Sequence, residues 1–331
     1  MLSALSALRS RLSARAVPGL AGQRSAASGA WHRREEAIMG TAVSVELWAD
    51  DARRAGAAMD AVMAEMHRID RTMSPHRADS ELSRINREAG DRPVPLSAEM
   101  AELVARAIDF SRWSDGAFDI SYASAGQHYD YRAGVAPDET TLAQARAAIG
   151  WQHLWLDRRA GTLRFGLPGM RIDLGGFAKG HAVDRCIALL RQRGIGHAIV
   201  SAGGDSHVLG DRRGRPWMVA VRDPRRAGAS VAVLPLQDAA VSTSGDYERY
   251  FERAGVRHHH LLDPRTGRSP GGVRSVTIVA DDGLTAEALS KTVFVLGRER
   301  GLALVNGLPG VDAVIVDAAG GLHHSAGLLP Q

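Results

Sequence analysis

The chain has 331 residues, which is enough for one large domain or about two smaller ones. Its 45% hydrophobic and 24% charged residues are the balance of an ordinary soluble globular protein. The net charge of +4 comes from arginines spread along the sequence, and without a basic stripe interleaved with aromatics it argues against nucleic-acid binding. The single cysteine, Cys186, excludes an intramolecular disulfide, and its place on the apolar face of a predicted helix favours a small buried side chain.

Residues 1–30 contain no Asp or Glu and are rich in Ala, Ser and Arg, so we expect a leader or disordered segment ahead of a folded domain at residues 31–331. Arg9, Arg11 and Arg15 interrupt its apolar runs, which makes it a poor secretory signal and a poor membrane span. The expected localisation is periplasmic if this segment is a signal and cytoplasmic otherwise. The segment has no cysteine to lipidate, so we expect no lipoprotein anchor.

The first half of the folded region predicts mainly helices. Between Asp50 and Met73, methionine and other apolar residues recur at helical spacing, which indicates a helix with one buried face. Ser97 stands before another such run and is typical of a helix N-cap. In chain order, we expect a strand at 42–48 entered through 39–41, a helix at 50–73, a polar loop at 74–86 passing into a short helix at 80–85, a helix after 97, a turn and short strand at 114–121, an aperiodic aromatic loop at 122–137, a helix at 141–149 and a hairpin at 154–157 and 163–165.

The stretch from Arg171 to Asp205 reads as strand, glycine turn, helix, glycine stop, strand and second glycine turn. Gly175 and Gly176 let the backbone turn sharply and approach a ligand, and the helix that follows points unpaired N–H groups at that place. This arrangement predicts an anion site, which Asp173, Lys179 and the Gly203-Gly204-Asp205 turn after the next strand would surround with both charges. The plainer alternative is a strand-helix-strand unit whose glycines serve tight packing.

Two familiar nucleotide motifs are absent from this stretch. His181 and Ala182 stand where a P-loop requires Lys and Ser/Thr, and a Rossmann GxGxxG is missing. The remainder of the chain alternates strands with turns and one helix. We expect strands at 217–223 and 230–236, a strand at 240–252 with a small-residue turn at 243–245, a strong turn at 263–267 after a histidine cluster, a strand at 275–280, a helix at 285–297 and a strand at 312–317, with no linker after residue 35.

Eight of these segments, taken in order, resemble the motifs of the ApbE family of flavin transferases, also called FAD:protein FMN transferases. Any one of them would be weak, but eight in register are specific, and the match as a whole runs from Ile38 to about Asp317. The segments are MGT at 39–41, SELSRIN at 80–86, DGAFDI at 115–120, IDLGGFAKGHAVD at 172–184, VSAGGD at 200–205, TSGDYERY at 243–250, HLLDPRTG at 260–267 and ALSKTVFVLG at 288–297.

The resemblance implies an α+β fold, with a mainly antiparallel sheet and packed helices in a single domain of two intertwined subdomains. It also implies an activity: FMN moves from FAD, through its phosphate, to a Thr or Ser hydroxyl of an acceptor flavoprotein subunit, with release of AMP and help from Mg2+. Phosphoryl transfer of this kind needs positioning and neutralisation of charge more than covalent help. Two alternatives stay open: an FAD pyrophosphatase that uses water as acceptor, and a non-catalytic flavin-binding protein.

The resemblance assigns roles residue by residue. His260 would draw the proton from the acceptor hydroxyl, a role in which His258 or His259 could compete, and Lys179 would supply positive charge. The residues that match FAD contacts or the phosphate or metal region are Met39, His76, Asp173, Lys179, Leu262, Thr243, Ser244 and Gly245. As apolar residues, Met39 and Leu262 could equally belong to the core. A serine nucleophile in STSG is a rival reading that no GxSxG context supports.

The flavin-stacking residues depart from the family pattern. His76 stands where relatives often have a tyrosine, and the tryptophan-containing loop that many relatives place after the FDI motif is missing. Tyr122, Tyr129 and Tyr131, in the segment that takes its place, are the candidates for stacking.

The metal site departs further. Relatives carry an Asp and, four residues later, a Thr that reach Mg2+, whereas this chain has Glu287 and Lys291. In one explanation the Lys291 ammonium occupies or borders the metal position and neutralises the pyrophosphate itself. In the other, Lys291 turns aside, and Glu287 holds the ion with backbone carbonyls near Gly176 and Ala178. An exposed Glu-Lys pair at i, i+4 is the alternative without function, worth about 0.2–0.5 kcal/mol.

Overall fold

The computed structural model describes residues 29–328, and its centre is an eight-stranded sheet in the order β1-β2-β6-β7-β10-β13-β14-β15. Every neighbouring pair in this sheet is antiparallel. The strands are β1 (Ala30–Ile38), β2 (Thr41–Ala49), β6 (Ala198–Ala202), β7 (Asp205–Leu209), β10 (Ala239–Gly245), β13 (Val273–Ala280), β14 (Asp312–Asp317) and β15 (Leu322–His324). The predicted α+β class with a mainly antiparallel sheet is confirmed.

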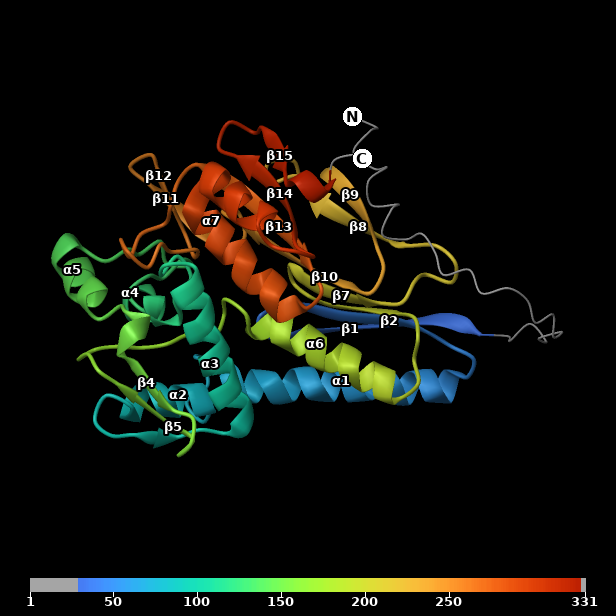
Figure 1. The fold of residues 1–331 in the computed structure, drawn as a ribbon, viewed down its shortest axis with the longest axis horizontal. Helices are drawn as coiled ribbons and strands as arrows, with labels where there is room; N and C mark the ends of the chain where they lie inside the picture. The colour runs from blue at the N-terminus through green and yellow to red at the C-terminus, as the bar shows by residue number, and fades with distance from the viewer. Residues whose placement is uncertain (1–28, 329–331) are drawn as a thin grey trace.

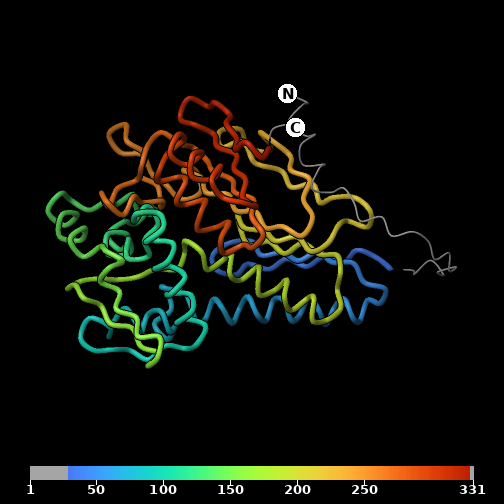
Figure 2. Tube along the Cα trace, viewed as in Figure 1, coloured from blue at the N-terminus to red at the C-terminus, as the bar shows by residue number. Residues whose placement is uncertain are grey.

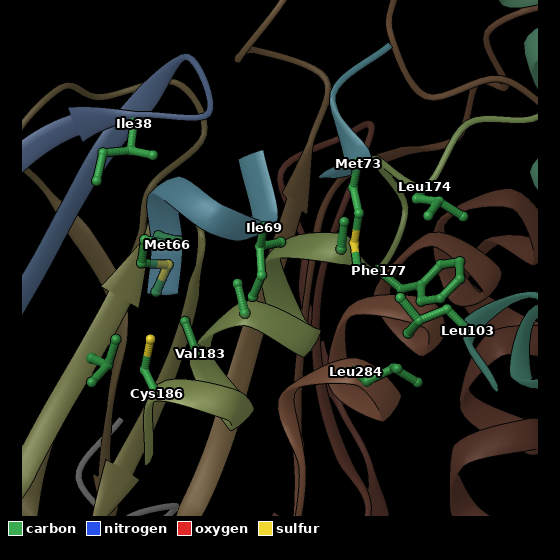
Figure 3. Close-up of a cluster of buried hydrophobic side chains, with 14 of the residues drawn as sticks. Ile38, Met66, Ile69, Met73, Leu103, Leu174, Phe177, Val183, Cys186 and Leu284 are labelled. Carbon is green, nitrogen blue, oxygen red and sulfur yellow. The ribbon is translucent and has the colours of Figure 1, made fainter. Parts of the chain in front are cut away.

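Three helices cover one face of this sheet: α1 (Ala52–Met73), α6 (Ala178–Gln192) and α7 (Gly283–Asn306) (Figure 1). α1 forms where the spacing predicts it, and the side chain of Asp51 caps its first turn by accepting from two backbone N–H groups. Its methionine stripe is core: Met66 is fully buried and lies close to Cys186 of α6 (Figure 3). Burial of one such side chain is worth about 1.5–3 kcal/mol, so this stripe holds α1 on the sheet.

A two-stranded ribbon packs on the opposite face of the sheet. It consists of β8 (Trp217–Arg222) and β9 (Ser230–Leu236), both of which the sequence predicts. Trp217 is buried in a cluster with Val241 of β10 and the half-buried Trp31 of β1. Because side chains alternate along a strand, Ala240 and Ser242 point to the other face, toward α7.

The segment between α1 and α6 forms a second lobe that lies beside the ends of these two helices (Figure 2). Its core is continuous with that of the main sheet: Leu103 and Phe118 share one buried cluster with Val45 and Val183. This continuity makes the fold a single domain with two intertwined parts, as expected. The elements are α2 (Glu81–Glu88), β3 (Val94–Pro95), α3 (Ala98–Trp113), 3-10 turns at Ile120–Tyr122 and Trp151–His153, α4 (Ala123–Gly126), α5 (Glu139–Ala147), β4 (Leu154–Asp157) and β5 (Thr162–Phe165), with sheet order β3-β5-β4.

Two hairpins were not predicted from the sequence. β1 pairs with β2 through Met39 and Gly40, and β11 (Tyr250–Arg253) pairs with β12 (Val256–His259) through Ala254 and Gly255. In both turns the two residues have positive φ, with Met39 at 55° and Ala254 at 50°. Type I′ two-residue hairpin turns require this geometry, but their usual sequence signal is Asn-Gly or Asp-Gly, which neither turn carries.

Two predicted strands are wrong. Residues 171–174 join no sheet, because the side-chain amide of Asn86 bonds both the N–H and the C=O of Ile172, at 2.8 and 2.9 Å. The segment at 114–121 contains a turn and a 3-10 turn instead of a strand, since the Asp119 carboxylate caps the N–H of Ser121 at 2.8 Å. In both places side chains satisfy the backbone groups that a neighbouring strand would otherwise satisfy.

The predicted turn at 243–245 is also wrong. Thr243, Ser244 and Gly245 are the last residues of β10 and pair with β13. α7 is longer than predicted because a second helical segment continues after Gly297, whose φ of 78° breaks the helical geometry.

No helix in residues 29–328 is long and apolar enough to cross a membrane. Nearly all of the expected leader at residues 1–30 falls outside the described residues, so its role and the domain boundary stay predictions.

Candidate active site

Four charged side chains form a buried cluster where α6, α7 and β7 meet, which we call the charge cluster: Lys179, Asp205, Glu287 and Lys291. The Lys179 ammonium bonds Asp205 Oδ2 at 2.7 Å and also donates to Glu287 Oε1. The Lys291 ammonium bonds the same Glu287 oxygen at 3.1 Å. The side chain of Glu287 is 0% exposed and that of Asp205 is 3% exposed. Two positive and two negative charges balance here, as burial of charge requires.

A close crossing of α6 and α7 brings these residues together. A Cβ atom on Gly180 would lie 2.2 Å from the carbonyl oxygen of Gly283, so only glycine permits this approach. Asp184 of α6 then fixes the start of α7 by accepting from the N–H groups of Gly283 and Leu284 at 2.7 and 3.0 Å. The same carboxylate bonds the buried His207 of β7 at 2.6 Å. The three elements that carry the charge cluster are therefore locked to one another.

Glu287 also completes the amino end of α6. Phe177 stands at the N-cap position and offers no side-chain acceptor, and Glu287 Oε2 accepts from the Gly180 N–H at 2.7 Å. A carboxylate at this end of a helix is favourable because of the unpaired N–H groups and the helix dipole. The anion site predicted at the Gly175–Gly176 turn is thus partly filled by a carboxylate of the protein itself.

The charges in the cluster shift one another's protonation. Burial lowers the pKa of Lys179, but the carboxylates of Asp205 and Glu287 outweigh it and raise the pKa above its usual range. Burial raises the pKa of Asp205, yet Lys179 and Lys291 together bring it below its usual range. For Lys291, burial and the nearby Lys179 outweigh Glu287 and lower the pKa. Asp205 Oδ1 has no hydrogen-bond partner among the described residues.

A layer of hydroxyl groups lies under the charge cluster. Ser290 of α7 bonds Ser242 and Ser244 of β10 at 3.1 and 2.8 Å and donates to the Glu287 carbonyl at 2.8 Å. Thr243 points to the opposite face of the strand, where it bonds Thr277 at 2.8 Å. Ser244 is 4% exposed. It pairs with another serine rather than with a histidine, so the rival idea of a serine nucleophile gains no support.

Above the charge cluster, Asp173 is surrounded by groups from distant parts of the chain. Its Oδ1 accepts from the Gly175 N–H, and a Cβ on Gly175 would lie 3.9 Å from the Tyr122 hydroxyl. Burial raises the pKa of Asp173, while this N–H and the charges of His76 and Arg249 oppose the rise. The guanidinium of Arg249 lies over the turn that begins with Met39, since Nη2 is 3.5 Å from where a Cβ of Gly40 would be.

His260 directly follows β12 and lies near Arg249 and Lys291. Its backbone N–H donates to the Arg249 carbonyl at 3.1 Å, and its Nδ1 is buried without a partner among the described residues. Burial, helped by the positive charges of Lys291 and Arg249, lowers the pKa of His260 to about 3. The imidazole is therefore neutral at pH 7 and able to accept a proton.

The neighbouring histidines are placed differently. His258 stacks on Phe251, with ring centroids 4.9 Å apart, and His259 bonds the Pro270 carbonyl at 3.1 Å and packs on Phe294. Among the charges that act on the pKa of each of the three, only those on His260 include Lys291 of the charge cluster.

The comparisons with known proteins decide the family. The ApbE family model matches residues 39–315, most of the chain. The chain belongs to the ApbE family. It is 33% identical over 321 residues to the FAD:protein FMN transferase of Treponema pallidum, covering 91% of this chain and 88% of that protein. It is 34% identical over 246 residues to the one of Vibrio cholerae, covering 72% of this chain and 73% of that protein.

Solved structures agree with this membership. The ApbE protein of Thermotoga maritima matches with a TM-score of 0.82 and 31% identity, over 90% of this chain and 97% of that one. The flavin transferase ApbE of Vibrio cholerae matches with a TM-score of 0.80 and 28% identity, over 91% of this chain and 98% of that one.

The residues that the ApbE resemblance singled out do not all meet at one point. Lys179, Glu287 and Lys291 share the charge cluster, and Gly176 and Ala178 flank it at the start of α6. Asp173 and the exposed His76 lie together, with Met39 half-buried against the core. Leu262 is 6% exposed and reaches the second lobe, where Tyr122 is its neighbour across Gly126. Thr243 is the one that points away.

Of the three candidate tyrosines, only Tyr122 lies near the site. Burial, helped by the charge of Asp173, raises its pKa well above the usual range. Tyr129 and Tyr131 stack on each other, with ring centroids 5.7 Å apart, and the Tyr129 hydroxyl donates to the Gly267 carbonyl at 2.9 Å. They join the second lobe to the segment after β12.

Sequence reasoning missed Arg249. The described residues include no ion-pair partner for its exposed guanidinium, although it lies among Asp173, Tyr122 and His260. An arginine inside the matched TSGDYERY motif, following a predicted site turn, was the available signal.

The residues at the implied Mg2+ position do not fit a divalent cation. Both oxygens of Glu287 are already in use: Oε1 meets two ammonium groups and Oε2 meets the Gly180 N–H. Mg2+ requires near-octahedral oxygen ligands at about 2.0–2.1 Å, and a lysine ammonium offers no lone pair. No group of three or more His, Cys, Asp or Glu side chains in residues 29–328 is arranged to hold a metal.

Proposed function

We propose that this ApbE-family chain transfers FMN from FAD to a Thr or Ser hydroxyl of an acceptor protein and releases AMP. The observation that carries the proposal is the neutral His260, which lies near Lys291 of the charge cluster and whose buried Nδ1 has no partner in the described part of the chain. The names of the Treponema pallidum and Vibrio cholerae relatives support the same reaction.

The proposed step exchanges one phosphorus–oxygen bond for another. The acceptor hydroxyl oxygen attacks the phosphorus of the FMN half of FAD, the bond from that phosphorus to the bridging oxygen breaks, and AMP leaves with that oxygen. The hydroxyl proton passes to His260. Although the pKa of about 3 makes the free imidazole a weak base, an anionic pyrophosphate nearby offsets the charges of Lys291 and Arg249 and raises its proton affinity.

The other residues of the site would bind and orient FAD. Lys291 and Arg249, whose guanidinium has no ion-pair partner within residues 29–328, supply positive charge toward the pyrophosphate. Lys179 acts mainly through its neighbours, because Asp205 and Glu287 already engage its ammonium. Asp173, with its backbone fixed by the Ile120 carbonyl at 3.0 Å, is placed to accept from a flavin or adenine N–H.

Magnesium, which the family resemblance implies, has no role in this proposal, because the Glu287 oxygens are engaged. The acceptor is a protein segment that presents a hydroxyl near His260.

The test is to incubate the purified chain with FAD and a peptide carrying an acceptor threonine, and to measure AMP and the peptide mass together. Equal amounts of AMP and FMN-peptide support the transferase, and the matching peptide with alanine should stay unmodified. AMP with free FMN would indicate the pyrophosphatase instead. Bound FAD that yields no AMP with a family of acceptor sequences would indicate the flavin-binding protein and contradict the proposal.

A further inference from the structure

We propose that the ammonium group of Lys291 takes the place of a divalent cation in this site, so that the chain binds the pyrophosphate of FAD without Mg2+. This inference rests on the proposed function for its ligand, but it concerns which group supplies the positive charge.

The first support is the position of Lys291. It lies one turn after Glu287 on α7 and bonds Glu287 Oε1 at 3.1 Å, on the same oxygen that Lys179 uses. A cation placed against that oxygen would lie beside two ammonium groups and would be repelled by both. The place that an oxygen-bound ion would take is therefore already held by positive charge.

The second support is the number of hydrogen atoms that Lys291 has left to donate. An ammonium group has three N–H donors, and Glu287 is the only hydrogen-bond partner of the Lys291 ammonium among the described residues. Lys179 uses its donors on two carboxylates. Lys291 thus keeps two donors for a ligand, and phosphate oxygens are suitable acceptors.

The third support is burial. A glutamate and lysine at this spacing on a helix surface would both be in water, whereas Glu287 is 0% exposed and Lys291 is 18% exposed. The charge of Lys291 acts on the pKa of both His260 and Asp205, so its ammonium lies near them. The Glu287–Lys291 pair is therefore built into the site, near the proposed base.

The test begins with the wild-type chain, so that it does not depend on a variant folding. FAD affinity is measured by flavin fluorescence in EDTA and in excess Mg2+, and Mn2+ binding by electron paramagnetic resonance. We expect the FAD dissociation constants in EDTA and in excess Mg2+ to differ by no more than about 2-fold. We expect no Mn2+ to bind at this site. FAD binding that is lost in EDTA and restored by Mg2+ would overturn the inference.

A second arm converts the site. The double variant Glu287→Asp with Lys291→Thr removes the ammonium and restores oxygen ligands at both positions. We expect it to bind Mn2+ and to weaken its hold on FAD by about 10–100-fold in EDTA, with recovery in Mg2+. Arg300→Thr, an exposed charge loss on the same helix, should match wild type. A folded double variant that binds FAD in EDTA as tightly as wild type would show that Lys291 does not hold the pyrophosphate.

These outcomes are separable from failure of the proposed function. Unchanged FAD affinity in EDTA together with no FMN on any acceptor would leave the inference standing and remove the transferase. FMN transfer that requires Mg2+ would support the transferase and overturn the inference about Lys291.

Discussion

Two groups of charged side chains meet at the first turns of α6 and differ in how completely they are paired. In the surface network of α1, α3 and α6, Arg68 makes four hydrogen bonds of 2.7–2.9 Å to Glu65 and Glu99, and His181 adds a fifth at 2.8 Å. In the charge cluster, counting residues 29–328, Asp205 Oδ1 has no hydrogen-bond partner and the Lys291 ammonium has only Glu287.

This difference in pairing indicates which of the two groups of charges binds a ligand. The surface network lines a hollow of about 480 Å³ with both signs of charge, but its carboxylates and guanidinium already satisfy one another. A network in which every group is paired holds helices together and has nothing left to offer. The charge cluster is buried and incompletely paired within residues 29–328: Lys291 keeps donors that suit an anion, and the nearby His260 Nδ1 has no partner there.

The largest expected effect is on the chemistry. His260→Asn keeps a polar group of similar size but cannot accept the hydroxyl proton, so FMN transfer should slow by about 10²–10⁴-fold. FAD affinity should remain near wild type, and His258→Asn should transfer at the wild-type rate. Single-turnover AMP release at saturating FAD measures this. A normal rate in His260→Asn would remove His260 from the mechanism.

Breaking the pairing in the charge cluster should unfold the protein more readily. Lys179→Met leaves the buried carboxylates of Asp205 and Glu287 short of a partner, and we expect the free energy of unfolding in urea to fall by about 3–5 kcal/mol. Adding Glu287→Gln to Lys179→Met should recover part of that loss, because one of the uncompensated charges is gone. If the single variant is as stable as wild type, the cluster is not paired as described.

Acid should destabilise the fold through the buried histidines. The pKa of His260 is about 3 when folded and near 6.5 when unfolded, so only the unfolded chain takes up this proton between these values. Above pH 6.5 this proton does not lower the free energy of unfolding. As the pH falls from 6.5 toward 3, the free energy of unfolding decreases, with a slope of up to about 1.4 kcal/mol per pH unit. In urea unfolding between pH 7 and 5, the free energy of unfolding of His260→Asn should depend less steeply on pH than that of wild type. The difference should correspond to the uptake of up to one proton on unfolding. An unchanged slope would contradict the burial of this imidazole.

The smallest effect is expected in the surface network. Arg68→Met should lower the free energy of unfolding by about 1 kcal/mol or less, since the side chains are partly in water, and should leave FMN transfer unchanged. A loss of transfer in this variant would mean that the two groups are coupled and that the comparison above is wrong.

The sequence predicted the parts of the fold that depend on local patterns. The methionine spacing located α1, and the glycines and apolar face located α6 with Lys179 in its first turn. Family motifs singled out Glu287 and Lys291, which the structure brings together with Lys179. Each of these inferences needed only neighbours along the chain or a motif already in register.

What the sequence could not show depends on contacts between distant segments. Glu287 caps α6 because α6 and α7 cross closely at Gly180 and Gly283. These two glycines are more than 100 positions apart in the sequence. Thr243 and Ser244 looked like a turn because small residues favour turns, but pairing with β13 placed them on opposite faces of a strand. Arg249 reaches the site through a hairpin whose turn lacks the usual residues.

The most direct test of the central claim is a count of products in EDTA. The chain, FAD and a threonine-bearing acceptor peptide are mixed without any divalent cation, and AMP and FMN-peptide are quantified from the same sample. The account predicts equal amounts of the two, at a rate that added Mg2+ does not increase. Bound FAD with neither product in EDTA, and both products on addition of Mg2+, would contradict it.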